Sequence, residues 1–284
     1  MIKKILKHPL PLLFVAIIFA VSVIGYDVFF KSRQVLGQKS QIVVSTPSPQ
    51  AQQSPSPSTS PSPASTPSPK LSKSTYTIAL FGDSMIDTMG ENLDYLKKSL
   101  AAKYPGTIFK LYNYGIGSQN VEQGLARWGS AFSYQTRNYP PITQIGADVV
   151  IVGSFAYNPF PPHDRNRHFV DLGELVGRAK TTGANVYLLA EIAPLKVGFG
   201  KGPGGPNWPE DLASVQAQHI VEQLENAVNL SASDSVSLMN AYEASLYDGK
   251  FGNPVYVNQH DGIHPSVQGH VLIANLIART IKLK

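Results

Sequence analysis

The sequence predicts an α/β fold for residues 75–284, a three-layer sandwich in which helices cover both faces of a parallel sheet of about five strands. Three observations predict it. Short apolar, β-prone runs alternate along this region with longer segments of helical spacing. The roughly 210 residues suit one domain with a substantial core. The chain has no cysteine, so disulfides and thiolate metal sites are excluded.

The strands are predicted from short apolar runs bounded by turn residues. The run YTIALF is closed by Gly82, and DVVIV at 148–152 is continuously apolar, as expected of a strand buried on both faces. The five expected strands, in chain order, are 76–81, 108–112, 148–152, 185–192 and 236–239.

The helices are predicted from apolar residues spaced three and four apart. In the first, Leu93, Leu96 and Leu100 follow this spacing, and Pro105-Gly106 ends the segment. Residues 194–209 interrupt the alternation as a loop rich in glycine and proline. The expected helices are 91–103, 121–128, 167–181, 210–230 and 267–281.

The first 74 residues differ in composition from the rest. Residues 1–8 carry three lysines, and 9–26 form an almost uninterrupted apolar run, about long enough to span a bilayer. We expect a cytoplasmic 1–8, a single transmembrane anchor at 9–26 and an exported domain held at the cell membrane. The alternative is a cleaved signal peptide, which would make the protein secreted. Residues 27–74 are expected to be a disordered linker, since 20 of the 26 residues at 45–70 are Pro, Ser or Thr.

The basic charge of the chain belongs to its N-terminal part. Of the 24 Lys/Arg and 19 Asp/Glu in the whole chain, eight and one lie in residues 1–74, which leaves 16 and 18 in 75–284. The domain therefore carries a net charge of −2. This balance gives no electrostatic reason to expect nucleic-acid binding.

A serine directly follows the first predicted strand, in Phe81-Gly82-Asp83-Ser84. In a parallel α/β sheet, sites gather at the carboxyl ends of the strands, so the hydroxyl of Ser84 would be exposed at such an edge. A serine becomes nucleophilic when a neighbouring base takes its proton. The competing interpretation is that Ser84 only caps the next helix.

The base and its orienting acid are expected near the C-terminus, in Asp261-Gly262-Ile263-His264. Asp261 stands three residues before His264, so its carboxylate can fold back to accept a hydrogen bond from the imidazole. Pro265 is placed to open the last helix. The competing interpretation is a polar turn that caps this helix.

These two blocks resemble those of the SGNH (GDSL-type) hydrolases, a flavodoxin-like α/β/α family of esterases, lipases and carbohydrate deacetylases. The resemblance covers essentially all of residues 75–284. It implies a catalytic triad of Ser84, His264 and Asp261, with no cofactor and no metal.

The middle blocks of the family fit less closely. The segment 113–125 resembles the second block, and in that register the oxyanion glycine of the family falls on Ser118, whose backbone N–H still donates. Gly117 takes this role if the register slips by one. In the third block the family's asparagine arrives late, at Asn158, which is the candidate side-chain donor to the oxyanion beside the N–H groups of Ser84 and Ser118. The competing interpretation of Asn158 is a turn residue.

Three other features carry weaker signals. The run His163 to His168 mixes histidine and aspartate but does not by itself make a coordination sphere, so a solvated loop is favoured. Residues 197–209 are interpreted as a surface loop, with a mobile flap as the alternative. Asp87 is interpreted as a helix-capping acid.

Together these observations predict an extracytoplasmic serine esterase that acts on O-acyl, above all O-acetyl, esters of a cell-envelope or extracellular glycan, or on small esters. The domain is expected to be monomeric. One alternative is a polysaccharide O-acetyltransferase that uses the same triad. The other is a non-catalytic module that binds glycan or cell wall on this fold.

Overall fold

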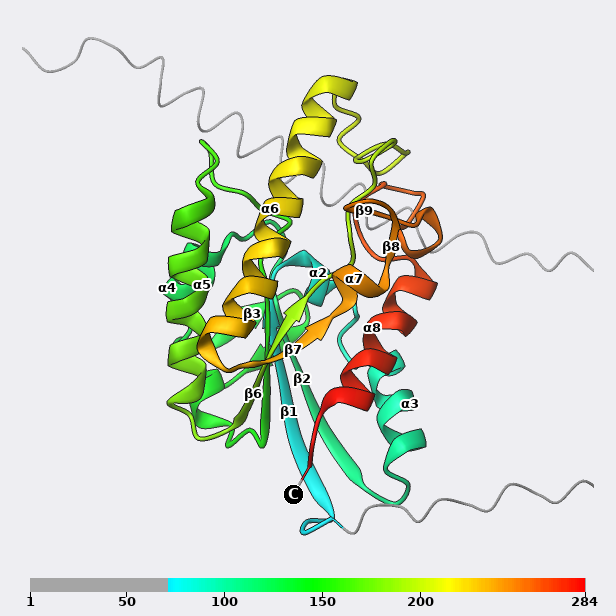
Figure 1. The fold of residues 1–284 in the computed structure, drawn as a ribbon. Coiled ribbons are helices and arrows are strands. Elements are labelled where there is room, and N and C mark those ends of the chain that lie inside the picture. Colours follow the sequence, from blue (N-terminus) through cyan, green and yellow to red (C-terminus); the bar gives the residue numbers. More distant parts are fainter. Residues whose placement is uncertain (1–70, 284) are drawn as a thin grey trace, which may run out of the picture. The chain divides into compact units, whose positions relative to one another are not determined.

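The computed structural model describes residues 71–283, and these form a single α/β unit (Figure 1). The predicted segments 1–8 and 9–26 and nearly all of the linker lie outside the described residues. Between residues 71 and 283, none of the helices combines the length and the hydrophobicity needed to cross a membrane.

A five-stranded sheet, with every neighbouring pair parallel, forms the centre of the unit. Its order is β2-β1-β5-β6-β7, which is the flavodoxin-type order 2-1-3-4-5 when these strands are numbered along the chain. All five residues of β5 are buried, because helices cover both faces of the sheet. The strands are β1 (Thr75–Gly82), β2 (Ile108–Gly115), β5 (Val149–Gly153), β6 (Asn185–Ala190) and β7 (Ser237–Asn240).

Helices cover the sheet in two groups. On one face α3 packs against α8, and on the other α5 packs against α4 and α6 (Figure 1). Asn120 and Gln123 form a capping box that begins α4, and the Ser266 hydroxyl caps α8. The five helices are α3 (Asp94–Lys103), α4 (Val121–Arg127), α5 (Arg165–Lys180), α6 (Glu210–Asp234) and α8 (Val267–Thr280).

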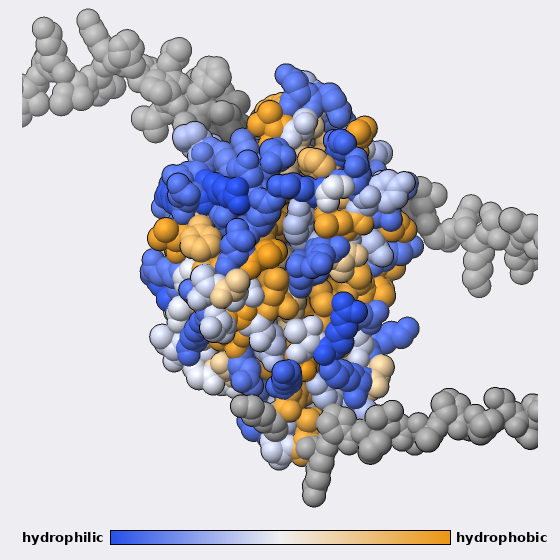
Figure 2. Space-filling view, viewed as in Figure 1, coloured by the Kyte–Doolittle hydropathy of each residue, from blue (hydrophilic) through white to orange (hydrophobic). Residues whose placement is uncertain are grey.

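The surface of the unit carries both hydrophobic and hydrophilic residues. In the view of Figure 2, hydrophobic residues show in the middle of the face, and hydrophilic residues dominate its upper part. The core lies between sheet and helices, and includes the fully buried side chains of Leu80, Ile151 and Leu188. The three-layer fold predicted from the sequence is therefore confirmed.

The unit also contains short elements that were not predicted from the sequence. Two are one-turn α-helices, two are 3₁₀ turns, and two are small antiparallel hairpins separate from the main sheet. Each of them is too short to show a periodic pattern of apolar residues. They are α2 (Ser84–Asp87), α7 (Ala241–Ala244), η2 (Ile142–Gln144), η3 (Pro254–Tyr256), the hairpin of β3 (Phe132–Tyr134) and β4 (Arg137–Tyr139), and the hairpin of β8 (Leu246–Asp248) and β9 (Phe251–Gly252).

Candidate active site

Ser84 stands where β1 ends, as the first residue of α2. The cap of this helix is Asp83, whose Oδ1 accepts a hydrogen bond of 2.9 Å from the Met85 amide. The interpretation of Ser84 as the helix cap is therefore wrong. Its hydroxyl makes no hydrogen bond to any residue in the described part of the chain. The side chain is half-buried at the carboxyl edge of the sheet.

Two glycines allow α2 to sit directly on the strand ends. A Cβ on Gly115, the last residue of β2, would lie 2.3 Å from the Asp87 amide nitrogen. A Cβ on Gly153, the last residue of β5, would lie 2.7 Å from Glu191 Oε1 and 3.4 Å from the Gly82 Cα. At both positions a Cβ would lie too close to a neighbouring atom, and at Gly115 that neighbour is the backbone of α2, which can therefore lie directly on the end of β2.

Asp261 and His264 lie in the turn that leads into α8 and are hydrogen-bonded to each other. Asp261 Oδ2 is 3.0 Å from His264 Nδ1, and Oδ1 accepts from the amides of Ile263 and His264 at 2.8 and 2.9 Å. Burial alone would raise the pKa of Asp261, but these hydrogen bonds outweigh it and lower the pKa below its ordinary value. The carboxylate therefore stays ionised and orients the imidazole.

The His264 imidazole is near the segment that carries Ser84. Burial raises the pKa of Asp83 and of Asp87, and the charge of His264 opposes the shift at both. These carboxyl groups flank Ser84 on either side along the chain. No hydrogen bond joins the Ser84 hydroxyl to the His264 ring among residues 71–283. Such bonds are often long in the absence of substrate and shorten in the reacting complex.

The three candidate oxyanion donors lie on separate segments that approach α2. Ser118 is exposed with φ +60°, in the left-handed region that favours glycine, and it stands after β2. A Cβ on the preceding Gly117 would lie 3.9 Å from Asp87 Oδ2, which places this turn beside α2. Asn158 Nδ2 donates a hydrogen bond of 2.9 Å to Asp83 Oδ2, so Asn158 contacts the residue before Ser84.

A second carboxyl group lies behind the site, and the sequence analysis missed it. Glu191 follows β6 and is fully buried; its Oε1 accepts a hydrogen bond of 2.8 Å from the Ser154 amide, and Oε2 contacts the Ser154 hydroxyl. Burial and the neighbouring Asp83 raise the pKa of Glu191 to about 8. Burial likewise raises the pKa of Asp83 to about 6. An acid directly after an apolar strand, in NVYLLAEI, was the available signal.

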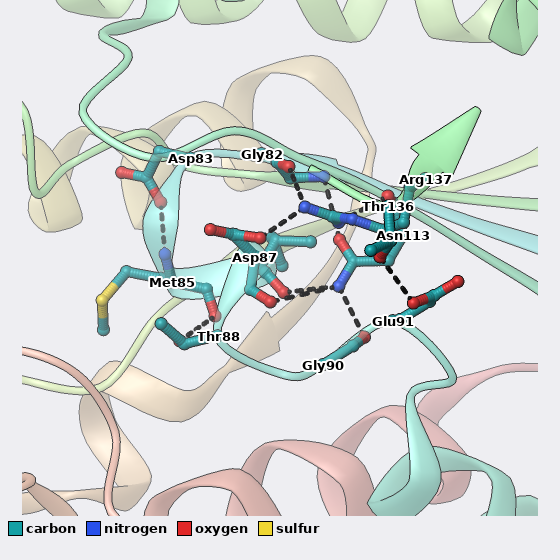
Figure 3. Close-up of polar contacts among 12 residues, drawn as sticks. Gly82, Asp83, Met85, Asp87, Thr88, Gly90, Glu91, Asn113, Thr136 and Arg137 are labelled. Carbon is teal, nitrogen blue, oxygen red and sulfur yellow. Dashed lines mark hydrogen bonds and ion pairs between the residues drawn. The ribbon is translucent and has the colours of Figure 1, made fainter. Parts of the chain in front are cut away.

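Arg137, on the β3–β4 hairpin, holds α2 from the other side (Figure 3). Its side chain is 2% exposed, pairs with Asp87, and donates to the carbonyls of Asn113 and Gly115 at 2.8 and 3.1 Å. The Asn113 amide in turn donates to the carbonyls of Ile86 and Gly90. The interpretation of Asp87 as a capping acid is wrong, because its carboxylate serves as the partner of this buried arginine.

Arg127, on α4, connects the two loops that carry the backbone oxyanion candidates. Its Nη2 donates to the Gly82 carbonyl at 2.8 Å and its Nε to Gln119 Oε1 at 2.6 Å. The guanidinium lies over the Phe81 ring, 4.0 Å from the ring centroid. Burial lowers the pKa of Arg127 to about 9, and the nearby Asp83 opposes this shift. The side chain remains charged at neutral pH and stabilises the segment before Ser84.

The histidine-rich run at 163–168 does not join the site. His168 is buried in α5, where Nε2 lies 2.8 Å from the Ser154 carbonyl oxygen. His163 stacks on His219 with ring centroids 3.9 Å apart and pairs with Glu222. Across residues 71–283, no group of three or more His, Asp or Glu side chains is arranged to hold a metal ion.

Comparison with known proteins bears on the fold. No family model matches the chain, and no curated sequence does. Solved structures match it well. A lipase/acylhydrolase from Enterococcus faecalis is 21% identical with a TM-score of 0.53, over 74% of this chain and 97% of the other.

Two further structures share this similarity. A GDSL-like lipase from Bacteroides thetaiotaomicron VPI-5482 is 17% identical with a TM-score of 0.51, over 72% of this chain and 86% of the other. The acetyl xylan esterase AlAXEase is 14% identical with a TM-score of 0.52, over 72% of this chain and all of the other. At these identities the comparison shows the fold alone, which the chain shares with this GDSL-like lipase, this lipase/acylhydrolase and this acetyl xylan esterase.

Proposed function

We propose that this chain is a serine esterase that cleaves small O-acyl esters, above all O-acetyl esters, with Ser84 as nucleophile, His264 as general base and Asp261 as orienting acid. One observation carries the proposal: Asp261 Oδ2 lies 3.0 Å from His264 Nδ1, in the geometry that orients an imidazole as a base, while Ser84 stands half-buried at the carboxyl edge of the sheet. The shared fold supports it, since proteins with this fold are named lipases, acylhydrolases and an acetyl xylan esterase.

The reaction proceeds in two steps of acyl transfer. His264 takes the proton of the Ser84 hydroxyl while Oγ bonds to the ester carbonyl carbon. The oxyanion that forms is held by the amides of Ser84 and Ser118 and by the side-chain amide of Asn158. His264 then protonates the leaving alcohol as its C–O bond breaks. Water, deprotonated by His264, attacks the acyl-enzyme and releases the acid and the free serine.

The three candidate oxyanion donors differ in the hydrogen bonds that they already make within the protein. Amides of Ser84 and Ser118 donate to no residue among 71–283, so both N–H groups remain for the substrate. Asn158 commits one of its two N–H bonds to Asp83 and keeps the other. The bond to Asp83 fixes the orientation of the amide before substrate arrives, which lowers the reorganisation needed in the transition state.

The substrate class and the location follow from the whole sequence. A Pro/Ser/Thr-rich linker behind an apolar N-terminal segment is typical of exported proteins held at a membrane. We therefore assign the esterase to the outside of the cell membrane, where O-acetylated glycans of the envelope or surroundings are the available esters. Cleavage of the N-terminal segment would release the same enzyme as a secreted protein.

The test is the activity of Ser84→Ala on a series of p-nitrophenyl esters of increasing chain length. The substitution removes the nucleophile and is expected to lower kcat by about 10⁴-fold or more. Acetate is expected to be the preferred acyl group. Ser214→Ala is the matched control, since Ser214 is an exposed serine on α6 that has no part in the proposed reaction. Undiminished turnover by Ser84→Ala would exclude Ser84 as the nucleophile.

Labelling with a fluorophosphonate probe distinguishes the esterase from a glycan-binding module. The left-handed Ser118 in the place of a glycine is the observation that favours the binding module. An esterase is labelled at Ser84 in the wild type and not in Ser84→Ala. A folded wild-type protein that takes no label supports the binding module. Hydrolysis compared with transfer of the acetyl group to added glycan distinguishes esterase from acetyltransferase.

A further inference from the structure

The glycine-rich loop between β6 and α6 packs directly against the turn that carries Asp261 and His264. The Gly200 amide donates to the Gly262 carbonyl at 3.1 Å, and the Gly204 amide donates to the His260 carbonyl at 2.8 Å. These two bonds connect the segment 200–207, here called the brace loop, to the turn at 258–264. The loop is a surface loop, as expected from its composition, and one of its sides is held to the neighbouring turn.

The contact between the brace loop and the turn is backbone against backbone. A Cβ on Gly202 would lie 2.3 Å from the His260 carbonyl oxygen, and a Cβ on Gly205 would lie 2.6 Å from the Asp261 carbonyl oxygen. A Cβ on Gly262, across the interface, would lie 2.8 Å from the Lys201 amide nitrogen. No side chain fits on these three glycines, and the His260 ring fills the space beside Gly204, so the glycines set the separation of the two segments.

The brace loop is also fixed within itself. The Asn207 side-chain amide donates to the carbonyls of Gly202 and Gly205 at 2.8 and 2.9 Å, and its oxygen accepts from the Gly202 amide at 3.2 Å. At the end of the loop, the ring of Trp208 stacks on that of Phe199 with centroids 6.1 Å apart. Asn207 therefore closes the loop into a ring that resists displacement.

We propose that the brace loop is a positioning element that holds the Asp261–His264 turn at the correct distance from Ser84, with Gly205 and Asn207 as its positioning residues. The inference rests on the proposed function, because it assigns a role in that same reaction. Gly205 lies against the carbonyl of Asp261, so any outward movement of this contact moves the carboxylate and the imidazole hydrogen-bonded to it. A misplacement of about 1 Å costs about 100-fold in rate.

Gly205→Ala tests the proposal most directly. Gly205 does not have a positive φ, so alanine can adopt its backbone conformation, and the added methyl group would press on the carbonyl oxygens of Gly200 and Asp261, 2.4 and 2.6 Å from its position. We expect kcat for p-nitrophenyl acetate to fall about 10- to 100-fold with KM little changed. The rate of fluorophosphonate labelling at Ser84 should fall by the same factor. Gly129→Ala is the matched control, because Gly129 has no positive φ and no atom within 4 Å of its Cβ position.

Asn207→Ala is the second variant and decides the question if Gly205→Ala does not fold. Asn207 is exposed, so its loss loosens the brace loop without disturbing the core. We expect a lower kcat, and a weakened or shifted far-downfield proton resonance of the hydrogen bond between Asp261 and His264. A role in stability alone would leave that resonance in place.

The outcomes separate the two proposals. Wild-type kcat and an unchanged resonance in folded Gly205→Ala and Asn207→Ala would overturn the positioning role while the esterase stands. If Gly205→Ala does not fold, the same result in Asn207→Ala alone overturns it. If Ser84→Ala keeps wild-type turnover, the esterase itself fails, whatever the brace-loop variants do.

Discussion

At the scale of single residues, the pair Asp83 and Glu191 is the chemical feature that most distinguishes this site. Both side chains are fully buried, and each is held by hydrogen bonds: Asp83 by Met85 and Asn158, Glu191 by Ser154. Two carboxylates so close in a poorly solvated place repel each other. One of them is best kept neutral, and Glu191, with its pKa near 8, is the residue that keeps the proton at neutral pH.

Replacement of Glu191 by glutamine is predicted to change how stability depends on pH. The pKa of Glu191 is raised from 4.5 to about 8 by folding, so the native state binds the extra proton and its stabilising effect is lost as pH rises through 8. In Glu191→Gln the side chain stays neutral at every pH, and its amide oxygen can still accept the hydrogen bond from the Ser154 amide.

The measurement is the free energy of unfolding from urea denaturation at pH 5.5 and pH 8.5. Wild type should lose stability between these values, whereas Glu191→Gln should lose markedly less and be the more stable protein at pH 8.5. The remaining slope in the variant comes from groups such as Asp83, whose raised pKa of about 6 contributes in the lower part of the range. Equal slopes in the two proteins would show that Glu191 ionises as freely as in the unfolded chain.

At the scale of secondary-structure elements, the β3–β4 hairpin supports α2 through one arginine. Arg137→Ala leaves Asp87, which is 14% exposed, without its charged partner. We predict a loss of about 3–5 kcal/mol in the free energy of unfolding, because breaking a buried ion pair strands one charge. Urea denaturation at pH 7 measures this loss.

The control is Lys196→Ala, which removes an exposed ion pair with Asp248 whose side chains are both 58% exposed. This pair is expected to contribute less than about 1 kcal/mol. If both substitutions cost the same, Arg137 does not hold α2 in the way that its contacts indicate.

The elements that the sequence predicts well are those long enough to show a period. The strand expected at 148–152 is β5 at Val149–Gly153, and the helix expected at 267–281 is α8 at Val267–Thr280. The hairpin of β3 and β4 was missed, because three-residue strands show no alternation to detect. The role of Arg137 was missed with the hairpin, because only the fold brings this residue to Asp87.

In the candidate site, too, the contact between residues close in the sequence was predictable, and the contacts between distant residues were not. Asp261 and His264 are three residues apart, so their contact follows from local geometry and was predictable. Arg127 and Arg137 contact the Ser84 segment from positions distant in the chain, and no local pattern reports such contacts. The tight fit of the brace loop was also hidden, because a run of glycines predicts a loop equally well whether the loop is packed or exposed.

At the scale of the whole molecule, the sheet and its helices are complete within residues 75–280. We predict that a chain beginning at residue 71 folds cooperatively and hydrolyses p-nitrophenyl acetate with the kcat/KM of the full chain. A chain beginning at residue 77 is the comparison. It lacks the Lys73–Asp148 ion pair, the Ser74 carbonyl that accepts from Ile108 and the first two residues of β1, and it should unfold at lower temperature. Thermal unfolding followed by circular dichroism measures the difference.

The position of β1 has a mechanical consequence. It is an interior strand, bonded to β2 on one side and to β5 on the other, and the preceding chain enters at the end of β1 opposite to Ser84. A force applied at the N-terminal end of β1 therefore acts on the hydrogen bonds to both neighbouring strands at the same time. These bonds must break together and not one after another. The β1 strand is therefore secured on both sides against a force transmitted by the preceding chain.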